Sequence, residues 1–134
     1  MKRFSVKAAI IAVSAVIAAA ASCGNTYTIK GAEDAAGFLL SRGVEVSGGG
    51  SCKTVTVPSE FGEVYERYNE LQKQAGYDLS GYASREAEVY TFRIAAVNGR
   101  PSEYTEAHVM VCDSIVIGGD IASLSPDGGM APLP

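Results

Sequence analysis

The sequence has no tryptophan, a single histidine and only three cysteines among its 134 residues. It contains no CxxC pair, and His108 has no second ligand at metal-binding spacing, so we expect no metal site. No nucleophile stands beside a base in an identifiable motif, so we expect no catalytic residue and no cofactor. A chain of this length forms one domain and is too short for a TIM barrel or a two-domain enzyme.

Basic side chains are scarce after the first 22 residues. Lys2, Arg3 and Lys7 lie within those residues, which contain no acid. Without them, 112 residues remain with eight basic and 15 acidic side chains, a net charge of −7. Binding to nucleic acid needs a basic patch that neutralises phosphates. The charge balance therefore excludes a nucleic-acid partner.

The start of the chain predicts export. After the basic residues 1–7, an apolar run from Ala8 to Ala21 is interrupted only by Ser14. The run is shorter than the roughly 18–20 residues of a stable membrane span. A basic start, a short apolar run and small residues at its end are typical of a secretory signal peptide, here residues 1–22. An uncleaved N-terminal anchor is the alternative.

Cys23 extends this prediction to a lipid anchor. Residues 20–24, Ala-Ala-Ser-Cys-Gly, resemble a bacterial lipobox, with Ala20 where leucine is usual. In a lipobox the cysteine is diacylated and becomes the new N-terminus, and two acyl chains hold stably to a bilayer. We therefore expect a lipoprotein on the outer face of the cell membrane. Secretion without a lipid is the alternative.

Two cysteines remain if Cys23 is acylated. Export permits a disulfide between Cys52 and Cys112, but two cysteines so far apart in sequence do not define one. A bridge and two free thiols both stay open.

The hydrophobic patterns predict two helices and about four strands. Residues 23–31 are expected to form a tether, and residues 32–134 a single domain. The expected order is helix 32–42, strand 53–57, helix 59–75 and strands 86–96, 105–112 and 115–117, with a flexible glycine-rich break at 47–51. Strands joined by short links are antiparallel. Because amphipathic helices can cover one face of a sheet, we predict a two-layer α+β domain with a mainly antiparallel sheet.

The second helix should begin after Ser59, a plausible N-cap. Its apolar side chains recur at helical spacing and are expected to face the core: Phe61, Val64, Tyr65, Tyr68, Leu71 and Ala75. The last predicted strand should bulge or break at Gly118-Gly119, with Asp120 bonding nearby backbone amides.

Five short blocks of sequence follow one another in a distinctive order. They are residues 55–61 (VTVPSEF), 64–72 (VYERYNELQ), 76–82 (GYDLSGY), 90–92 (YTF) and 115–121 (IVIGGDI). Together they resemble the domain-of-unknown-function 4830 family, small exported proteins of clostridia and relatives. The resemblance covers roughly residues 32–133. It implies an exported, often lipid-anchored domain and carries over no activity.

Tyr77, Tyr82 and Asp120 are the candidate contacts to a partner or ligand, and His108 is interpreted as a histidine on a sheet face. Tyrosine is enriched at interfaces, and the first two lie in a predicted loop. We expect a non-enzymatic extracytoplasmic domain that binds a protein or another envelope component. One alternative is an envelope enzyme that uses carboxylates such as Asp120 or Glu86. The other is a small-ligand binding module with an apolar cavity between helices and sheet.

Overall fold

The computed structural model of the protein describes residues 28–125 and 128–134. The predicted signal peptide 1–22, the predicted lipid attachment at Cys23 and most of the expected tether lie outside the described residues. Within the described part of the chain, no helix combines the length and apolar character needed to cross a membrane.

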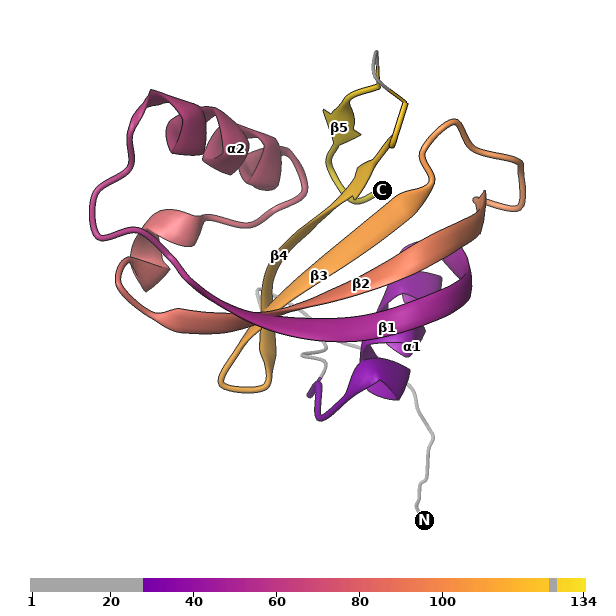
Figure 1. The fold of residues 1–134 in the computed structure, drawn as a ribbon, viewed down its shortest axis with the longest axis horizontal. Coiled ribbons are helices and arrows are strands. Elements are labelled where there is room, and N and C mark those ends of the chain that lie inside the picture. Colours follow the sequence, from indigo (N-terminus) through magenta and orange to yellow (C-terminus); the bar gives the residue numbers. More distant parts are fainter. Residues whose placement is uncertain (1–27, 126–127) are drawn as a thin grey trace.

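Five strands form one antiparallel sheet in the order β1-β2-β3-β4-β5 (Figure 1). The elements in chain order are α1 (Ala32–Ser41), β1 (Val44–Thr56), α2 (Glu63–Gln74), the 3-10 helix η1 (Leu79–Tyr82), β2 (Glu86–Val97), β3 (Glu106–Cys112), β4 (Ile115–Ala122) and β5 (Met130–Ala131). The predicted α+β class, with two helices and an antiparallel sheet, is confirmed. The sheet has five strands rather than four because the short β5 pairs with the end of β4.

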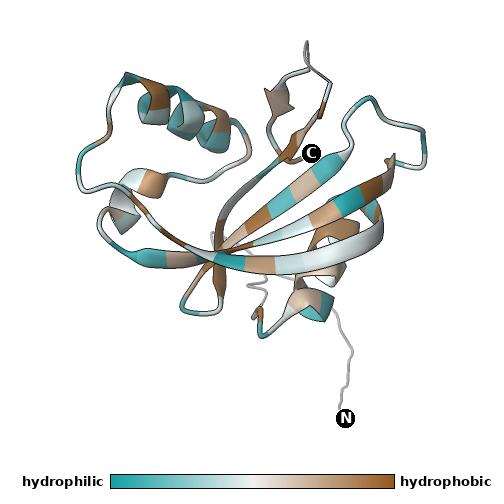
Figure 2. Cartoon of the chain, in the orientation of Figure 1, coloured by the Kyte–Doolittle hydropathy of each residue, from teal (hydrophilic) through white to brown (hydrophobic). Residues whose placement is uncertain are grey.

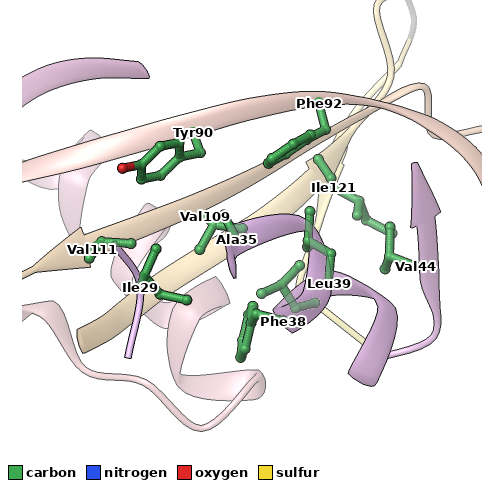
Figure 3. Packing of buried hydrophobic residues seen from close by; sticks show 12 residues of the cluster. Ile29, Ala35, Phe38, Leu39, Val44, Tyr90, Phe92, Val109, Val111 and Ile121 are labelled. Atoms are coloured by element: carbon green, nitrogen blue, oxygen red, sulfur yellow. The ribbon is translucent and has the colours of Figure 1, made fainter. Parts of the chain in front are cut away.

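Helix α1 packs on one face of the sheet. Its Ala35, Phe38 and Leu39 are buried and belong to one apolar cluster with Tyr90 and Phe92 of β2 (Figure 3). Burying a Phe or Leu side chain contributes roughly 1.5–3 kcal/mol relative to leaving it exposed, so this cluster is a major source of stability.

Helix α2 and η1 pack on the opposite face of the sheet from α1, whereas the prediction placed both helices on the same face. Alternate residues of a strand point to opposite faces. On β3, Val109 belongs to the cluster around α1, while Met110 and Cys112 belong to a second cluster with Leu79 of η1 and Ile117. The sheet can accept a helix on each face because β3 is apolar on both.

The glycine-rich segment 47–51 lies inside β1 and is not a flexible break. The register of β1 against β2 shifts three times between Glu45 and Ser51, and Gly49 and Gly50 have positive φ. Figure 2 shows this part of β1 as a pale, continuous strand. A Cβ on Gly50 would lie 3.0 Å from the Cβ of Ala32. The missing side chain therefore lets α1 lie close to β1.

Helix α2 begins at Glu63 with Gly62 as N-cap, so the predicted start after Ser59 was wrong. Its packed face also differs from the predicted apolar stripe. Val64 is 79 % exposed, whereas the amide side chains of Asn69 and Gln72 are buried. Their burial follows from hydrogen bonds to backbone groups of η1 and β4.

Strand β4 continues through the Gly-Gly pair instead of ending there. A register shift opposite Met110 leaves Ile117 as a bulged residue, and pairing then resumes at Gly118 and continues to Ala122. The bulge therefore lies at Ile117, one residue before the Gly118-Gly119 pair at which we expected it, and the pair itself is regularly paired with β3.

The folded domain includes residues that we had assigned to the tether. Ile29 is 2 % exposed in the α1 cluster, and its N–H donates to the carbonyl of Ser114 at 2.8 Å. Thr28 forms a β-bridge with Ile115. Thr28 and Ile29, the first described residues, are therefore bonded to the β3–β4 turn and the start of β4.

Two Gly→Ala substitutions should have opposite effects on stability. A Cβ on Gly119 would lie 2.6 Å from the His108 carbonyl oxygen and 2.6 Å from Leu133 Cδ1. We expect Gly119→Ala to lower the free energy of unfolding by about 1–3 kcal/mol through overpacking. Gly37→Ala in α1 meets nothing within 4 Å and should raise it by up to about 1 kcal/mol. Urea denaturation of both variants tests this, and equal effects would contradict the assigned packing.

Candidate functional site

A cluster of four polar side chains connects β3, β4 and α2, and we call it the His108 cluster: Tyr68, Glu106, His108 and Asp120. His108 and Asp120 are cross-strand partners on β3 and β4. The His108 Nδ1 lies 2.8 Å from Asp120 Oδ1, and the Tyr68 hydroxyl donates to Asp120 Oδ2 at 3.1 Å. The His108 Nε2 lies 3.2 Å from Glu106 Oε1. The imidazole is therefore flanked by two carboxylates.

Burial and charge decide the protonation of this cluster. Asp120 is 2 % exposed, and a buried carboxylate is tolerated only when it is paired. The hydrogen bond to Asp120 raises the pKa of His108 above its ordinary value, and the Glu106 carboxylate acts in the same direction, although burial opposes them. Burial, with the Asp120 carboxylate as a second cause, raises the pKa of Tyr68.

The geometry makes His108 a poor general base. A protonated imidazole donates from both nitrogens, and here each nitrogen faces a carboxylate oxygen. A base needs a free nitrogen within reach of the proton that it removes. The cluster instead ties α2 to the sheet. Across residues 28–125 and 128–134, no group of three or more His, Cys, Asp and Glu side chains could hold a metal ion.

A second polar network holds η1 against α2. The Asp78 Oδ1 accepts from Asn69 Nδ2 at 3.0 Å and from the N–H of Ser80 at 3.0 Å. The Asn69 Oδ1 accepts the N–H of Leu79 at 2.7 Å. The bond from Asn69, followed by those from Ser80, lowers the pKa of Asp78 to about 2. This network is a structural cap for η1.

Tyr77, a predicted contact residue, is engaged by Arg42 at the end of α1. The Arg42 Nη1 donates to the Tyr77 hydroxyl at 3.2 Å, and Nε donates to the carbonyl of Pro134 at 2.7 Å. Burial raises the pKa of Tyr77, while the guanidinium acts in the opposite direction. Arg42 thus connects α1 with the loop after α2 and with the last described residue.

The three predicted contact residues do not form one surface. Tyr77 packs against the α1 cluster, Tyr82 packs against the α2 cluster, and Asp120 is buried beneath Tyr68. That each of them contacts a partner stays a prediction.

Cys52 and Cys112 are free thiols, the first exposed and the second buried. Cys52 is paired with Tyr90 and Cys112 lies on β3, so all of β2 separates them. Two strand spacings amount to roughly 9–10 Å, beyond the about 7 Å between Cα atoms that a disulfide allows. This sheet does not permit the bridge.

The surface has shallow depressions at both ends of the sheet. One of about 620 Å³ lies at the β2–β3 connection, lined by residues that include Asn98, Arg100 and Tyr104. Another of about 380 Å³ lies beside the β3–β4 turn, lined by residues that include Glu86 and Asp113. Glu86, the second candidate catalytic carboxylate, is therefore an exposed side chain at the turn end of the sheet.

Sequence reasoning missed Gln72, Asn69 and Glu106. Gln72 Oε1 accepts the N–H of Gly119 at 2.8 Å. Asn69 and Gln72 are three residues apart, and each is four residues after a tyrosine of the apolar stripe. That spacing places them on the flank of the packed face, and it is the signal that could have revealed them.

The chain belongs to the family described as domain of unknown function (DUF4830), whose family model matches residues 46–121. This range contains β1 from Val46, α2, η1, β2, β3 and most of β4. It therefore contains the whole His108 cluster and the whole network of Asn69 and Asp78, but not Arg42 or its partner Pro134. The predicted family is confirmed. No curated protein and no solved structure gives a significant match to the chain.

The single histidine gives a direct test of the His108 cluster. Because the pKa of His108 is raised in the folded protein, its contribution to stability is complete below the unfolded value of about 6.5 and disappears as the pH rises through the folded value. Wild type should exceed His108→Gln in unfolding free energy more at pH 5.5 than at pH 9. Urea denaturation at both pH values, with an NMR titration of the imidazole, measures this; a pH-independent difference would contradict the ion pairing.

Asn69→Ala should affect both stability and the ionisation of Asp78. It leaves the N–H of Leu79 without its acceptor, which should cost about 1–3 kcal/mol. It also removes the main cause of the low Asp78 pKa, which should rise from about 2 toward 3.8. Carboxyl NMR titration measures the pKa of Asp78. An unchanged Asp78 pKa in Asn69→Ala would contradict this network.

Proposed function

We propose that this protein is an exported domain, anchored to the outer face of the cell membrane by a lipid on Cys23, that binds a protein or another envelope component without catalysis. The observation that carries the proposal is the position of Cys23. It follows a signal-like segment with a lipobox-like end and precedes Thr28, the first residue fixed to the sheet, by only five positions.

Binding is favoured over catalysis by the state of the titratable groups. His108 has both ring nitrogens next to carboxylates, and Asp120 is covered by Tyr68. A substrate could reach Asp120 only if α2 moved. Glu86 lies exposed at the start of β2, where water screens its charge.

The charge of the exported part also limits the partner. Residues 23–134 carry a net charge of −7, so a basic or neutral surface is favoured over another acidic one.

The anchor is tested by Cys23→Ala, with Cys52→Ala as the matched control because it removes an exposed cysteine elsewhere. We expect Cys23→Ala to leave the membrane fraction and lose the diacylglyceryl mass, while Cys52→Ala keeps both. Fractionation with intact-mass measurement checks this. If Cys23→Ala stays in the membrane with an unchanged mass, the anchor is wrong.

The binding role is tested by crosslinking in the native envelope, with tagged protein that keeps its signal and Cys23. We expect one partner recovered in stoichiometric amount, with recovery lowered by Tyr82→Ala at the end of η1. Repeated recovery of the protein alone would contradict the binding role.

A further inference from the structure

The point at which the chain enters the fold limits how an anchored domain can stand on a membrane. Thr28 pairs with Ile115, and the N–H of Ile29 donates to Ser114, so the chain enters at the β3–β4 turn. Ile29 is 2 % exposed and cannot leave the core cheaply. The anchor therefore pulls on one end of the sheet.

The length of the tether decides between the possible orientations. Five residue steps separate Cys23 from Thr28 and span at most about 18 Å when fully extended. A flexible chain of this length has a mean span nearer about 12 Å. Strand β3 alone extends about 20 Å away from the turn, and the β2–β3 connection lies beyond it. The tether is too short for the far end to face the bilayer.

We infer that the end formed by the β3–β4 turn rests on the lipid headgroups and that the β2–β3 connection, residues 98–105, points away from the membrane. This inference rests on the proposed lipid anchor and adds the orientation of the domain. Figure 1 shows the turn and the β2–β3 connection at opposite ends of the sheet.

The side chains at the turn fit a headgroup layer rather than the hydrocarbon. Arg85 and Asp113 form an exposed ion pair there, and Glu86 and Asp113 line the depression beside the turn. Ile115, beside Thr28, is an exposed apolar side chain within this charged surround, 36 % exposed. Charged groups are costly to bury in hydrocarbon, so this end should rest at headgroup depth without insertion.

The orientation leaves the depression at the β2–β3 connection open to the outside. Its lining includes Asn98, Arg100 and Glu103, which are exposed. A partner that approaches from the cell wall side would reach this end first.

The test uses the full-length lipoprotein, purified and reconstituted in phosphatidylcholine–phosphatidylglycerol vesicles that contain a headgroup nitroxide lipid. Single fluorophores are attached at Glu86→Cys and at Glu103→Cys, two exposed positions with the same change of charge. Both carry Cys52→Ser, which removes the exposed native thiol, and the native Cys112 is buried. Glu88→Cys and Arg100→Cys form a second pair in case either variant fails to fold.

We expect quenching of the label at position 86 to be severalfold stronger than at position 103. Equal quenching, or stronger quenching at position 103, in protein whose mass shows the diacylglyceryl group would overturn the orientation and leave the anchor standing. Absence of that mass would instead overturn the proposed anchor, and this inference with it.

Discussion

The hydrogen bond from the Gly119 N–H to Gln72 Oε1 fixes the position of α2 on the sheet. The packing of α2 and η1 on that face depends on it. Strand β4 pairs with β5 only at Ile121 and Ala122, so its outer edge before them needs another acceptor. A buried N–H left unpaired would cost about 1–3 kcal/mol. Gln72 supplies that acceptor, although its own Nε2 is buried with no partner among the described residues.

The absence of side chains at two adjacent positions of β4 makes this contact possible. A Cβ on Gly118 would lie 2.9 Å from Gln72 Oε1, and a Cβ on Gly119 would meet Leu133 on the opposite face. The pair thus lets α2 approach one face and the C-terminal segment approach the other. Asp120, the next residue, joins α2 to β3 through Tyr68 and His108.

The two helices are attached to the sheet by different kinds of interaction. Helix α1 is held by apolar packing that includes Phe38 and Leu39. Helix α2 is held in large part by amide and carboxylate hydrogen bonds, among them those of Gln72 and Asp120. Titratable groups placed in such hydrogen bonds stabilise the attachment of α2 to the sheet.

The local sequence pattern predicted most of the helices and strands but not how they pack against one another. The alternation from Glu86 onward predicted β2 to within a residue, and the predicted helix 32–42 agrees with α1 to within a residue. The glycines of segment 47–51 predict a break because glycine disfavours strands, whereas the segment lies inside β1. The close approach of α1 favours glycine at position 50, and the approach of β2 favours it at position 49. Neither neighbour is visible in the local sequence pattern.

The candidate site was predicted in part for the same reason. Asp120 was selected, but its partners Tyr68 and Glu106 were not, because the pairing register that brings them together is a long-range property. The apolar stripe of α2 predicted Val64 inward, whereas hydrogen bonding by Asn69 and Gln72 turned those residues to the sheet. The spacing of apolar residues reports hydrophobicity alone. It carries no information on the need of the Gly119 N–H for an acceptor, which Gln72 supplies.

The sequence by itself determined the α+β class, the family and the charge balance, because these depend on local periodicity, order and composition. Only the tertiary structure decided that the helices lie on opposite faces, that both nitrogens of His108 are engaged, and that the chain enters at the β3–β4 turn. Each of these depends on strand register and on contacts between residues distant in sequence, which local propensity does not specify.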